Sequence, residues 1–552
     1  ASSNTAIGRY AVATLSSGIE NTGVGRAALT ANTSGSYNTG LGHYALQANT
    51  TASNNTAVGY QSLNANTASS NTAVGFISAV NNTTGSGNTS VGANSLQSNT
   101  TGSSHVAVGL QALYGNTTGA YNTALGYAAL NSNTTASNNT AVGYQALYTN
   151  VTGDGLVAVG KGALYSNTGA NNTAVGKDSL YSNSSGVQNS ALGYGTLYAN
   201  TTGQDNVALG YIALYSNTTG GQNVAVGRQA LYSNTTASNN TAMGYQAGYS
   251  QTTGNGGGGN LTAIGYQSAY SFTGSVNESY GSVFLGRQAG VNTTGGYDNA
   301  FVGARAGNSN TTGANNVVVG AAALYSNSTT SYNTAIGYQA MYSHTGGTSM
   351  GIGAQALYSN TTGDDNTAVG SYRPMYSNTT GAANSAFGRA SLLSNTTGSY
   401  NTAIGRDALY SNTTASNNTA VGYQASYSST TATGITTLGY QAGYANIGNY
   451  NTYLGAYAGN LNTSGTNNTV VGFNALSTAG TGGSNSVFGF GAMGANSSGA
   501  YNTALGTQAL QANTTANNNT AVGYQAGYSN QTGGNITAIG YQALYSNTGA
   551  NN

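Results

Sequence analysis

The chain has 552 residues, but only 3% of them are charged and the formal net charge is +1. So low a charge argues against nucleic-acid binding, which needs a basic stripe to displace counterions from phosphates. The sequence contains no cysteine, which excludes disulfide cross-links, and no apolar run approaches the roughly 20 residues of a membrane-spanning helix.

One phrase returns thirty-two times from Asn4 onward, as Asn-Thr-Ala-aliphatic-Gly or a close variant. Most copies begin seventeen residues apart, and the whole repeat reads approximately NTAVGYQALYSNTTGSN. A fixed short period is typical of a solenoid, in which each repeat is one coil stacked on the next. We therefore expect residues 1–552 to form a single continuous repeat array rather than a series of globular domains.

Each repeat is numbered here from its leading residue, which is usually Asn. Positions 2–4 and 7–10 are expected to be short extended segments, for example residues 56–58 and 61–64. Turns rich in Asn, Thr and Gly connect them, and these residue types are poor helix formers. The pattern predicts an all-β fold, a parallel β-roll or β-solenoid built from about 32 tandem 17-residue repeats.

Position 5 is Gly in every repeat. Only Gly adopts a positive φ freely or lets a second backbone approach closely. We interpret this column as the bend of each coil. Its representative structural glycines are Gly8, Gly59, Gly143, Gly244, Gly337, Gly422 and Gly523.

Position 4 is always a sizeable apolar residue, which predicts a buried column. Its representative core aliphatics are Val58, Val142, Val226, Ile336, Val421 and Val522. Positions 3, 5 and 8 carry small residues, and position 9 is usually Leu but Gly in six repeats. Because one coil holds so thin a core, we interpret the small-residue columns as the axis of an oligomer, expected to be a homotrimer.

Eight of the ten basic residues stand at position 6, where Tyr is the commonest residue, so this position is expected to face solvent. The Tyr columns at positions 6 and 10 are expected to stack as ladders, as are the Asn columns. Weak carbohydrate binding along the side is the alternative interpretation of the Tyr columns. Its candidate residues are Tyr144, Tyr211, Tyr245 and Tyr423.

The period is interrupted locally. Two adjacent lengthened repeats at 240–281 are expected to carry lateral loops, and one extra residue is inserted around Arg373-Pro374. Solenoids need atypical repeats to cover their open ends. Neither end of this sequence has that character, so we expect it to be a fragment of a longer fibre.

No constellation of reactive side chains is apparent. His43, His105 and His344 lie many repeats apart, and two of them occupy positions that vary freely, so we expect no metal site, no cofactor and no enzymatic activity. Glycosylation sequons recur, for example at Asn49, Asn99 and Asn234. We favour the interpretation that these Asn and Thr residues serve as turn formers.

At positions 3–8 the repeat reads Ala-Val-Gly-x-x-Ala, as in Ala141-Val142-Gly143-Tyr144-Gln145-Ala146. This motif resembles the head repeats of YadA-like trimeric autotransporter adhesins, although the YadA-type repeat is shorter. The whole repeat also resembles repeat regions of bacteriophage tail-fibre proteins. The resemblance implies a left-handed parallel β-roll, a homotrimer and an extracellular location on a virion tail fibre or a cell surface.

These patterns predict a structural fibre shaft of an extended adhesive appendage, first of all a phage tail fibre that supports host attachment. The alternatives are a bacterial surface trimeric adhesin head, or an extracellular filament that binds carbohydrate. An ice-binding solenoid is a third alternative, since regular Thr rows on flat solenoids can order water.

Overall fold

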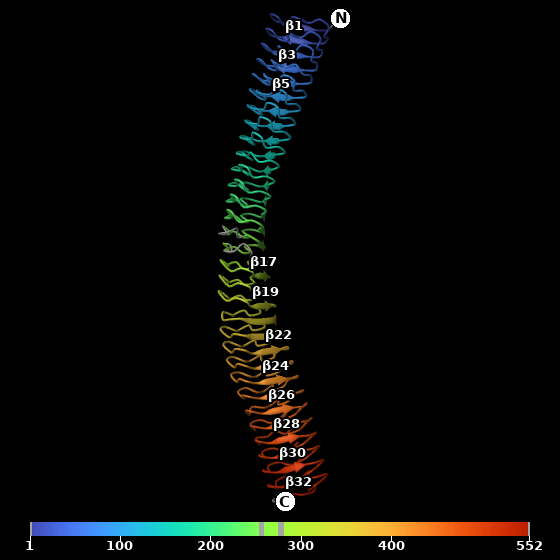
Figure 1. Cartoon of the computed structure of the whole chain (residues 1–552), viewed down its shortest axis with the longest axis vertical. Helices are drawn as coiled ribbons and strands as arrows, with labels where there is room; N and C mark the ends of the chain where they lie inside the picture. Colours follow the sequence, from blue (N-terminus) through green and yellow to red (C-terminus); the bar gives the residue numbers. More distant parts are fainter. Residues whose placement is uncertain (1–2, 253–258, 274–280, 550–552) are drawn as a thin grey trace. The chain divides into compact units, whose positions relative to one another are not determined.

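A computed structural model describes residues 3–252, 259–273 and 281–549. Within these residues the regular elements are all β-strands, and each repeat contributes one of them (Figure 1). The chain divides into two compact units, Ala1–Gly281 and Ser282–Asn552. Each unit is a parallel β-solenoid, as the repeat period predicts.

The strands of the first unit are β1 (Thr5–Ile7), β2 (Thr22–Val24), β3 (Thr39–Leu41), β4 (Thr56–Val58), β5 (Thr72–Val74), β6 (Thr89–Val91), β7 (Val106–Val108), β8 (Thr123–Leu125), β9 (Thr140–Val142), β10 (Val157–Val159), β11 (Thr173–Val175), β12 (Ser190–Leu192), β13 (Val207–Leu209), β14 (Val224–Val226), β15 (Thr241–Met243) and β16 (Leu261–Ile264).

Those of the second unit are β17 (Ser282–Leu285), β18 (Ala300–Val302), β19 (Val317–Val319), β20 (Thr334–Ile336), β21 (Ser349–Ala354), β22 (Asn366–Tyr372), β23 (Ser385–Phe387), β24 (Thr402–Ile404), β25 (Thr419–Val421), β26 (Thr436–Leu438), β27 (Thr452–Leu454), β28 (Thr469–Val471), β29 (Ser486–Phe488), β30 (Thr503–Leu505), β31 (Thr520–Val522) and β32 (Thr537–Ile539).

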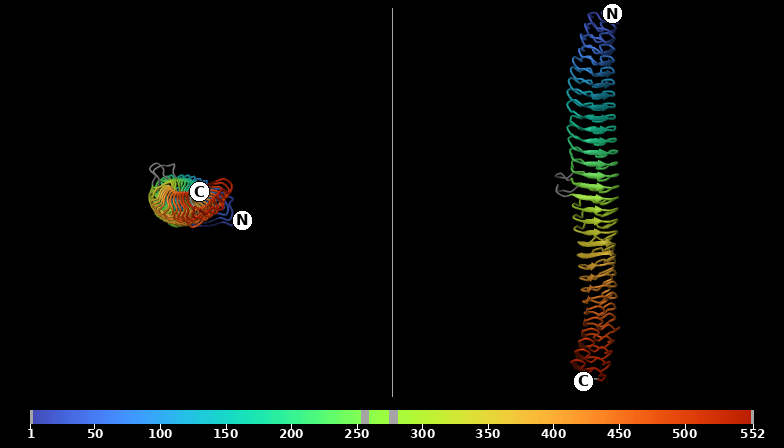
Figure 2. Two further views of the ribbon diagram at one scale, coloured as in Figure 1. Left: turned by 90° about the horizontal axis from the view of Figure 1, so that it is seen from below. Right: turned by 90° about the vertical axis from the view of Figure 1, so that its right-hand side faces the viewer.

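Consecutive strands pair in parallel and residue for residue. In the first unit Thr56–Val58 pairs with Thr72–Val74 in this way. In the second unit Thr503–Leu505 pairs with Thr520–Val522 in the same register. Figure 2 shows that the strands within each unit lie one above the next. Equivalent positions of successive repeats are therefore stacked into columns.

In most repeats the glycine that follows the strand makes the bend, whereas Gly353 and Gly370 lie within β21 and β22. At Gly143 φ is +136°, and a Cβ atom built there would lie 2.6 Å from the carbonyl oxygen of Gly160 on the next coil. Both the backbone conformation and the close approach exclude a side chain, which confirms the interpretation of the invariant column. The seven representative glycines have φ between +126° and +137°, namely Gly8, Gly59, Gly143, Gly244, Gly337, Gly422 and Gly523.

The prediction of a second extended segment at positions 7–10 is wrong. In the repeat from Asn139, Gln145 has φ +54° and Leu147 has φ +53°, whereas an extended strand needs negative φ. The main chain of this segment still bonds between coils, because Gln145 N–H donates to Tyr127 O at 2.9 Å and Leu147 N–H donates to Ala163 O at 3.0 Å. Inter-coil bonding therefore does not require strand geometry here.

The core consists of positions 3, 8 and 9. Ala141, Ala146 and Leu147 are fully buried in one representative repeat. The small columns at positions 3 and 8 therefore line the interior of the same chain, and the prediction that they form an oligomer axis is wrong. A coil this thin has room for only one large core side chain, so its neighbours must be small.

The predicted buried column at position 4 is also wrong for the single chain. Because residues two apart on a strand share a face, a buried position 3 turns positions 2 and 4 outward. The six representative aliphatics are only half-buried, namely Val58, Val142, Val226, Ile336, Val421 and Val522.

Parallel strand pairing continues through two irregular regions. β15 pairs with β16 across the first lengthened repeat, so Thr241 lies opposite Thr262. The lateral loops expected at 240–281 fall mainly on 253–258 and 274–280, outside the described residues. The inserted residue in the repeat from Asn366 is absorbed by a register shift between β21 and β22, in which Ala354 pairs with Tyr372.

Candidate interaction surfaces

Two buried asparagine ladders run through the coils. At position 1, Asn206 Nδ2 donates to Asn189 Oδ1 at 3.0 Å and to the carbonyl oxygen of Gly220 at 2.9 Å. At position 12, Asn217 Nδ2 donates to Asn200 Oδ1 at 2.7 Å and to the same Gly220 oxygen at 2.9 Å. Each ladder thus joins successive coils and also closes the turn of its own coil, which confirms the predicted Asn stacking.

The sequon asparagines belong to the position 12 ladder. Asn49, Asn99 and Asn234 have no exposed surface, so their amides are not accessible in the folded chain. Asn99 Nδ2, for example, donates to Asn82 Oδ1 at 2.7 Å. Their placement follows from turn and ladder chemistry, as the sequence interpretation favours.

Two histidines substitute for asparagine in these ladders, so the interpretation of their positions as freely variable is wrong. His105 stands at position 1, and its Nδ1 accepts a hydrogen bond from Asn122 N–H at 3.3 Å. Burial lowers the pKa of His105 to about 4, although a hydrogen bond with the main chain at Gly119 opposes that shift. Burial likewise lowers the pKa of His344 at position 12. Each ring is thus held neutral inside the coil.

Two columns of stacked tyrosines form an aromatic face. At position 10, an unbroken series of parallel rings runs from Tyr148 to Tyr270, and the Tyr198 and Tyr215 ring centroids are 5.1 Å apart. Between the columns, glutamines at position 7 form a third ladder, as where Gln246 Nε2 donates to Gln229 Oε1 at 3.0 Å. Stacking covers the ring faces and leaves mainly the ring edges exposed.

The candidate carbohydrate-binding tyrosines lie on this aromatic face. Tyr144 and Tyr211 are each about half exposed, which confirms that position 6 faces solvent, and Tyr245 and Tyr423 belong to the same column. Arg228 lies between Tyr211 and Tyr245, with its Cζ 5.5 and 5.8 Å from the two ring centroids. A cation thus replaces a ring without breaking the column.

The outward face of the strands carries an unbroken apolar column at position 4, whereas position 2 is Thr or Ser on most strands. Leu192 and Leu209 at position 4 are 50% and 41% exposed, and Val207 at position 2 is 43% exposed. These side chains border a shallow hollow of about 260 Å³ over three successive strands, β11, β12 and β13. We call this surface, made of positions 2 and 4, the strand face.

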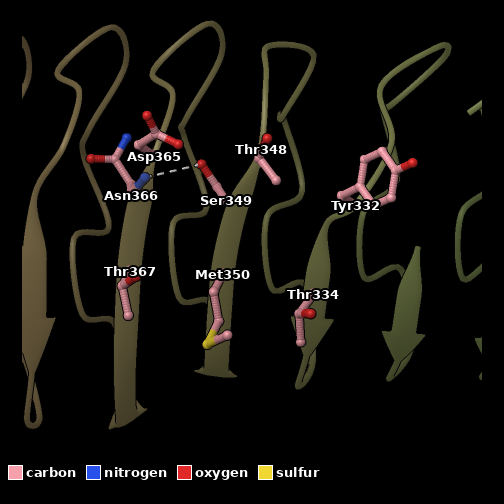
Figure 3. Close-up of a pocket in the computed structure, with 8 residues that line it drawn as sticks. All are labelled: Tyr332, Thr334, Thr348, Ser349, Met350, Asp365, Asn366 and Thr367. Carbon is pink, nitrogen blue, oxygen red and sulfur yellow. Dashed lines mark hydrogen bonds between the residues drawn. The ribbon is translucent and has the colours of Figure 1, made fainter. Parts of the chain in front are cut away.

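A second hollow on the strand face lies over β20–β22 (Figure 3). Thr334, Met350 and Thr367 lie side by side at position 2 of these strands, and Asn366 N–H donates to Ser349 Oγ at 3.3 Å. Its complete lining is Tyr332, Thr334, Thr348, Ser349, Met350, Asp365, Asn366 and Thr367. The hollow combines hydroxyl groups with one exposed thioether, which suits a contact surface.

The strand face was missed at the sequence level, although a signal was present. Strict exclusion of polar residues at position 4 was interpreted as burial within the chain. Period-two alternation with Ala at position 3 would have turned position 4 outward. Among the described residues there is no helical segment that could span a lipid bilayer.

Comparison with protein-family models gave no match, and a search among curated proteins gave no relative.

Proposed function

We propose that this chain is the shaft of an extended adhesive appendage, which holds a receptor-binding tip away from a particle or cell. The observation that supports this proposal best is the pair of buried asparagine ladders. They add side-chain hydrogen bonds to the main-chain bonds between successive coils. Bending or slipping at one coil would break several of these bonds together, so each solenoid unit should be stiff.

The setting that we propose first is a bacteriophage tail fibre that supports host attachment, with a bacterial surface trimeric adhesin as the alternative. Both settings are extracellular. The sequence resemblance to such fibres supports these two settings, and it also supports our proposal that the coil is left-handed. Immunogold electron microscopy with an antibody to this chain tests the choice. Label along fibres attached to virus tails is expected. Label confined to the bacterial envelope would favour the adhesin, and label inside cells would contradict both.

We further propose that the chain forms a homotrimer through the strand face. A continuous column of outward-facing apolar side chains, such as the one at position 4, is typical of an interface. A second copy of this chain has the same spacing between coils, so an aliphatic residue on each coil can meet its equivalent along a whole unit. The aliphatic column at position 4 would then be buried between chains rather than within one.

Single-cysteine variants test this interface, because the chain has no cysteine of its own. Leu209→Cys on the strand face is expected to form disulfide-linked dimers on mild oxidation, whereas Tyr211→Cys on the aromatic face serves as the matched control. Sedimentation equilibrium of the unmodified chain should give three times the monomer mass. A monomer at micromolar concentration, or equal cross-linking of both variants, would contradict the trimer but not the shaft.

A further inference from the structure

One hollow on the aromatic face concentrates positive charge. Arg373, Arg389 and Arg406 line it from three successive coils, although the whole chain has only ten basic residues. Asp407 is the one carboxylate in its lining. The hollow measures about 350 Å³ and is open to solvent over β22–β24. In so weakly charged a chain, this grouping calls for an explanation beyond solubility.

The hollow lies where two columns are interrupted: the tyrosines of position 10 on one coil, and the glutamines of position 7 on that coil and on the next, which carries Asp407. Leu393 replaces Tyr at position 10, and Ala390 replaces Gln at position 7. On one side Tyr376 stacks on Tyr358 at 5.1 Å, and on the other side Tyr410 stacks on Tyr427 at 4.9 Å. Since Leu393 is shorter than Tyr, the Tyr410 ring face toward that coil is not covered by a stacked ring.

The three guanidinium groups differ in their partners. Arg406 Nε lies 3.2 Å from Asp407 Oδ2. Arg373 Nε donates to Gln355 Oε1 at 2.8 Å, and its Cζ is 4.7 Å from the ring centroids of the two tyrosines beside it. Arg389 is exposed, and its guanidinium has no hydrogen-bond or ion-pair partner among the described residues. Its guanidinium is therefore available to a ligand.

We propose that this hollow binds a carboxylate-bearing sugar of an acidic polysaccharide, through Arg389 and the open ring face of Tyr410. A guanidinium fork matches a carboxylate in a bidentate arrangement. The aromatic ring and the Leu393 side chain offer an apolar wall for the C–H face of a pyranose. The charge is confined to three coils, so it does not extend into the stripe that a nucleic acid requires. This site adds lateral binding to the chain and does not depend on the shaft role.

A second hollow on the same face provides an internal comparison. It is lined by Lys161, Gly162 and Asp178 and measures about 370 Å³. Its position 10 column is unbroken, since Tyr165 and Tyr181 stack at 4.9 Å. Lys177 also pairs with Asp178 at 3.7 Å. The two hollows thus have similar volumes, and both have a cationic side chain nearby. Only the hollow lined by Arg389 combines an unpaired arginine with an uncovered tyrosine ring face.

Isothermal titration of the whole chain with trigalacturonate tests the proposal, with the methyl-esterified trisaccharide and inorganic phosphate as further probes. Arg389→Gln removes the free guanidinium, and Leu393→Tyr fills the gap with the residue that its neighbouring coils carry. Arg228→Gln is the matched control, because Arg228 occupies position 6 within a filled column.

Trigalacturonate is expected to bind, with affinity at least tenfold lower in Arg389→Gln and lost in Leu393→Tyr, but unchanged in Arg228→Gln. The methyl ester and phosphate should bind at least tenfold more weakly. No binding at millimolar concentration would overturn the proposal, as would equal affinity in Arg389→Gln and the unmodified chain. Phosphate that binds as tightly as trigalacturonate would overturn the assignment to a sugar.

Discussion

Coils β13 and β18 solve the same packing problem in opposite ways. The coil of β13 has Ala208 at position 3 and Leu214 at position 9, both buried. The coil of β18 has Phe301 at position 3 and Gly307 at position 9, and Phe301 is fully buried. A Cβ atom built at Gly307 would lie 2.3 Å from Phe301 Cε2. The two positions therefore share one space, which holds one large side chain from either side.

The same exchange recurs in two other coils, where the volume of the shared space is again preserved. Gly290 shares a coil with Phe284, and Gly459 shares one with the buried Tyr453. Cores tolerate exchanges that conserve volume far better than single changes in size. Position 9 can lose its leucine where position 3 grows, or where a neighbouring residue such as Leu261 fills the space beside Gly248.

Substitutions that convert the β18 packing pattern into the β13 pattern should have the largest effects on stability. Phe301→Ala should destabilise its coil by about 3–5 kcal/mol because it leaves a cavity, and Gly307→Leu by about 1–3 kcal/mol because it overpacks the space. The double variant restores the β13 pattern and should recover most of this loss. Amide hydrogen exchange at Gly307 N–H, which donates to Ala323 O, measures the local effect. Additive losses in the double variant would contradict the shared-space interpretation.

The ladder of the β13 coil should come next. Asn217→Ala removes bonds to Asn200 and Gly220 and leaves buried polar groups without their partner, at a cost of about 1–3 kcal/mol. Protection of neighbouring amides against hydrogen exchange should fall accordingly. Thr219→Ala in the same turn is the control, since Thr219 is exposed. Equal effects of the two changes would show that the ladder contributes little.

Acid should weaken the β7 coil, where His105 stands in for asparagine. The folded-state pKa of His105 is about 4, below its usual 6.5, so its contribution to stability is present above pH 6.5 and is lost as the pH falls toward 4. A loss of about 2 kcal/mol is expected at pH 5. Protection factors near Asn122 at pH 7 and pH 5 measure it, and His105→Asn should remove the pH dependence. His43→Asn is the control: His43 lies outside the ladders, so this variant should keep the pH dependence of protection near Asn122.

Repairing a broken asparagine ladder should give the smallest effect, a small increase in stability. Asn412 Oδ1 and Ser429 Oγ are buried without a hydrogen-bond partner in the described part of the chain, because serine interrupts the position 12 column there. Ser429→Asn can donate to Asn412 and should stabilise this coil by about 1 kcal/mol. Slower amide exchange in the β25 coil would confirm the gain. Faster exchange would mean that the coil lacks room for the amide.

The glycine column shows what could be predicted from the sequence. An invariant residue in a repeat has a local cause, and for Gly143 the cause is its φ and the neighbouring backbone. The asparagine and tyrosine ladders could be predicted equally well, because a fixed period stacks identical residues.

Position 4 shows why the rest could not be predicted. Exclusion of polar residues from Val142 indicates contact with something apolar, but it does not distinguish the interior of one chain from an interface. The prediction of an extended segment at positions 7–10 was wrong for a different reason. Leu147 adopts a positive φ that leucine rarely takes, and the bonds between coils impose it against local preference.

In-register columns also make the length of such a chain easy to change. If one regular coil were deleted from the run β11–β14, its two neighbours would meet with matching hydrogen-bond donors, ladder amides and ring spacings. Gene rearrangements that add or remove whole repeats would then alter reach in steps of one coil, without requiring compensating mutations. Coils such as β17 and β18, whose Phe284 and Phe301 rings pack edge to face at 5.3 Å, would tolerate such deletions least.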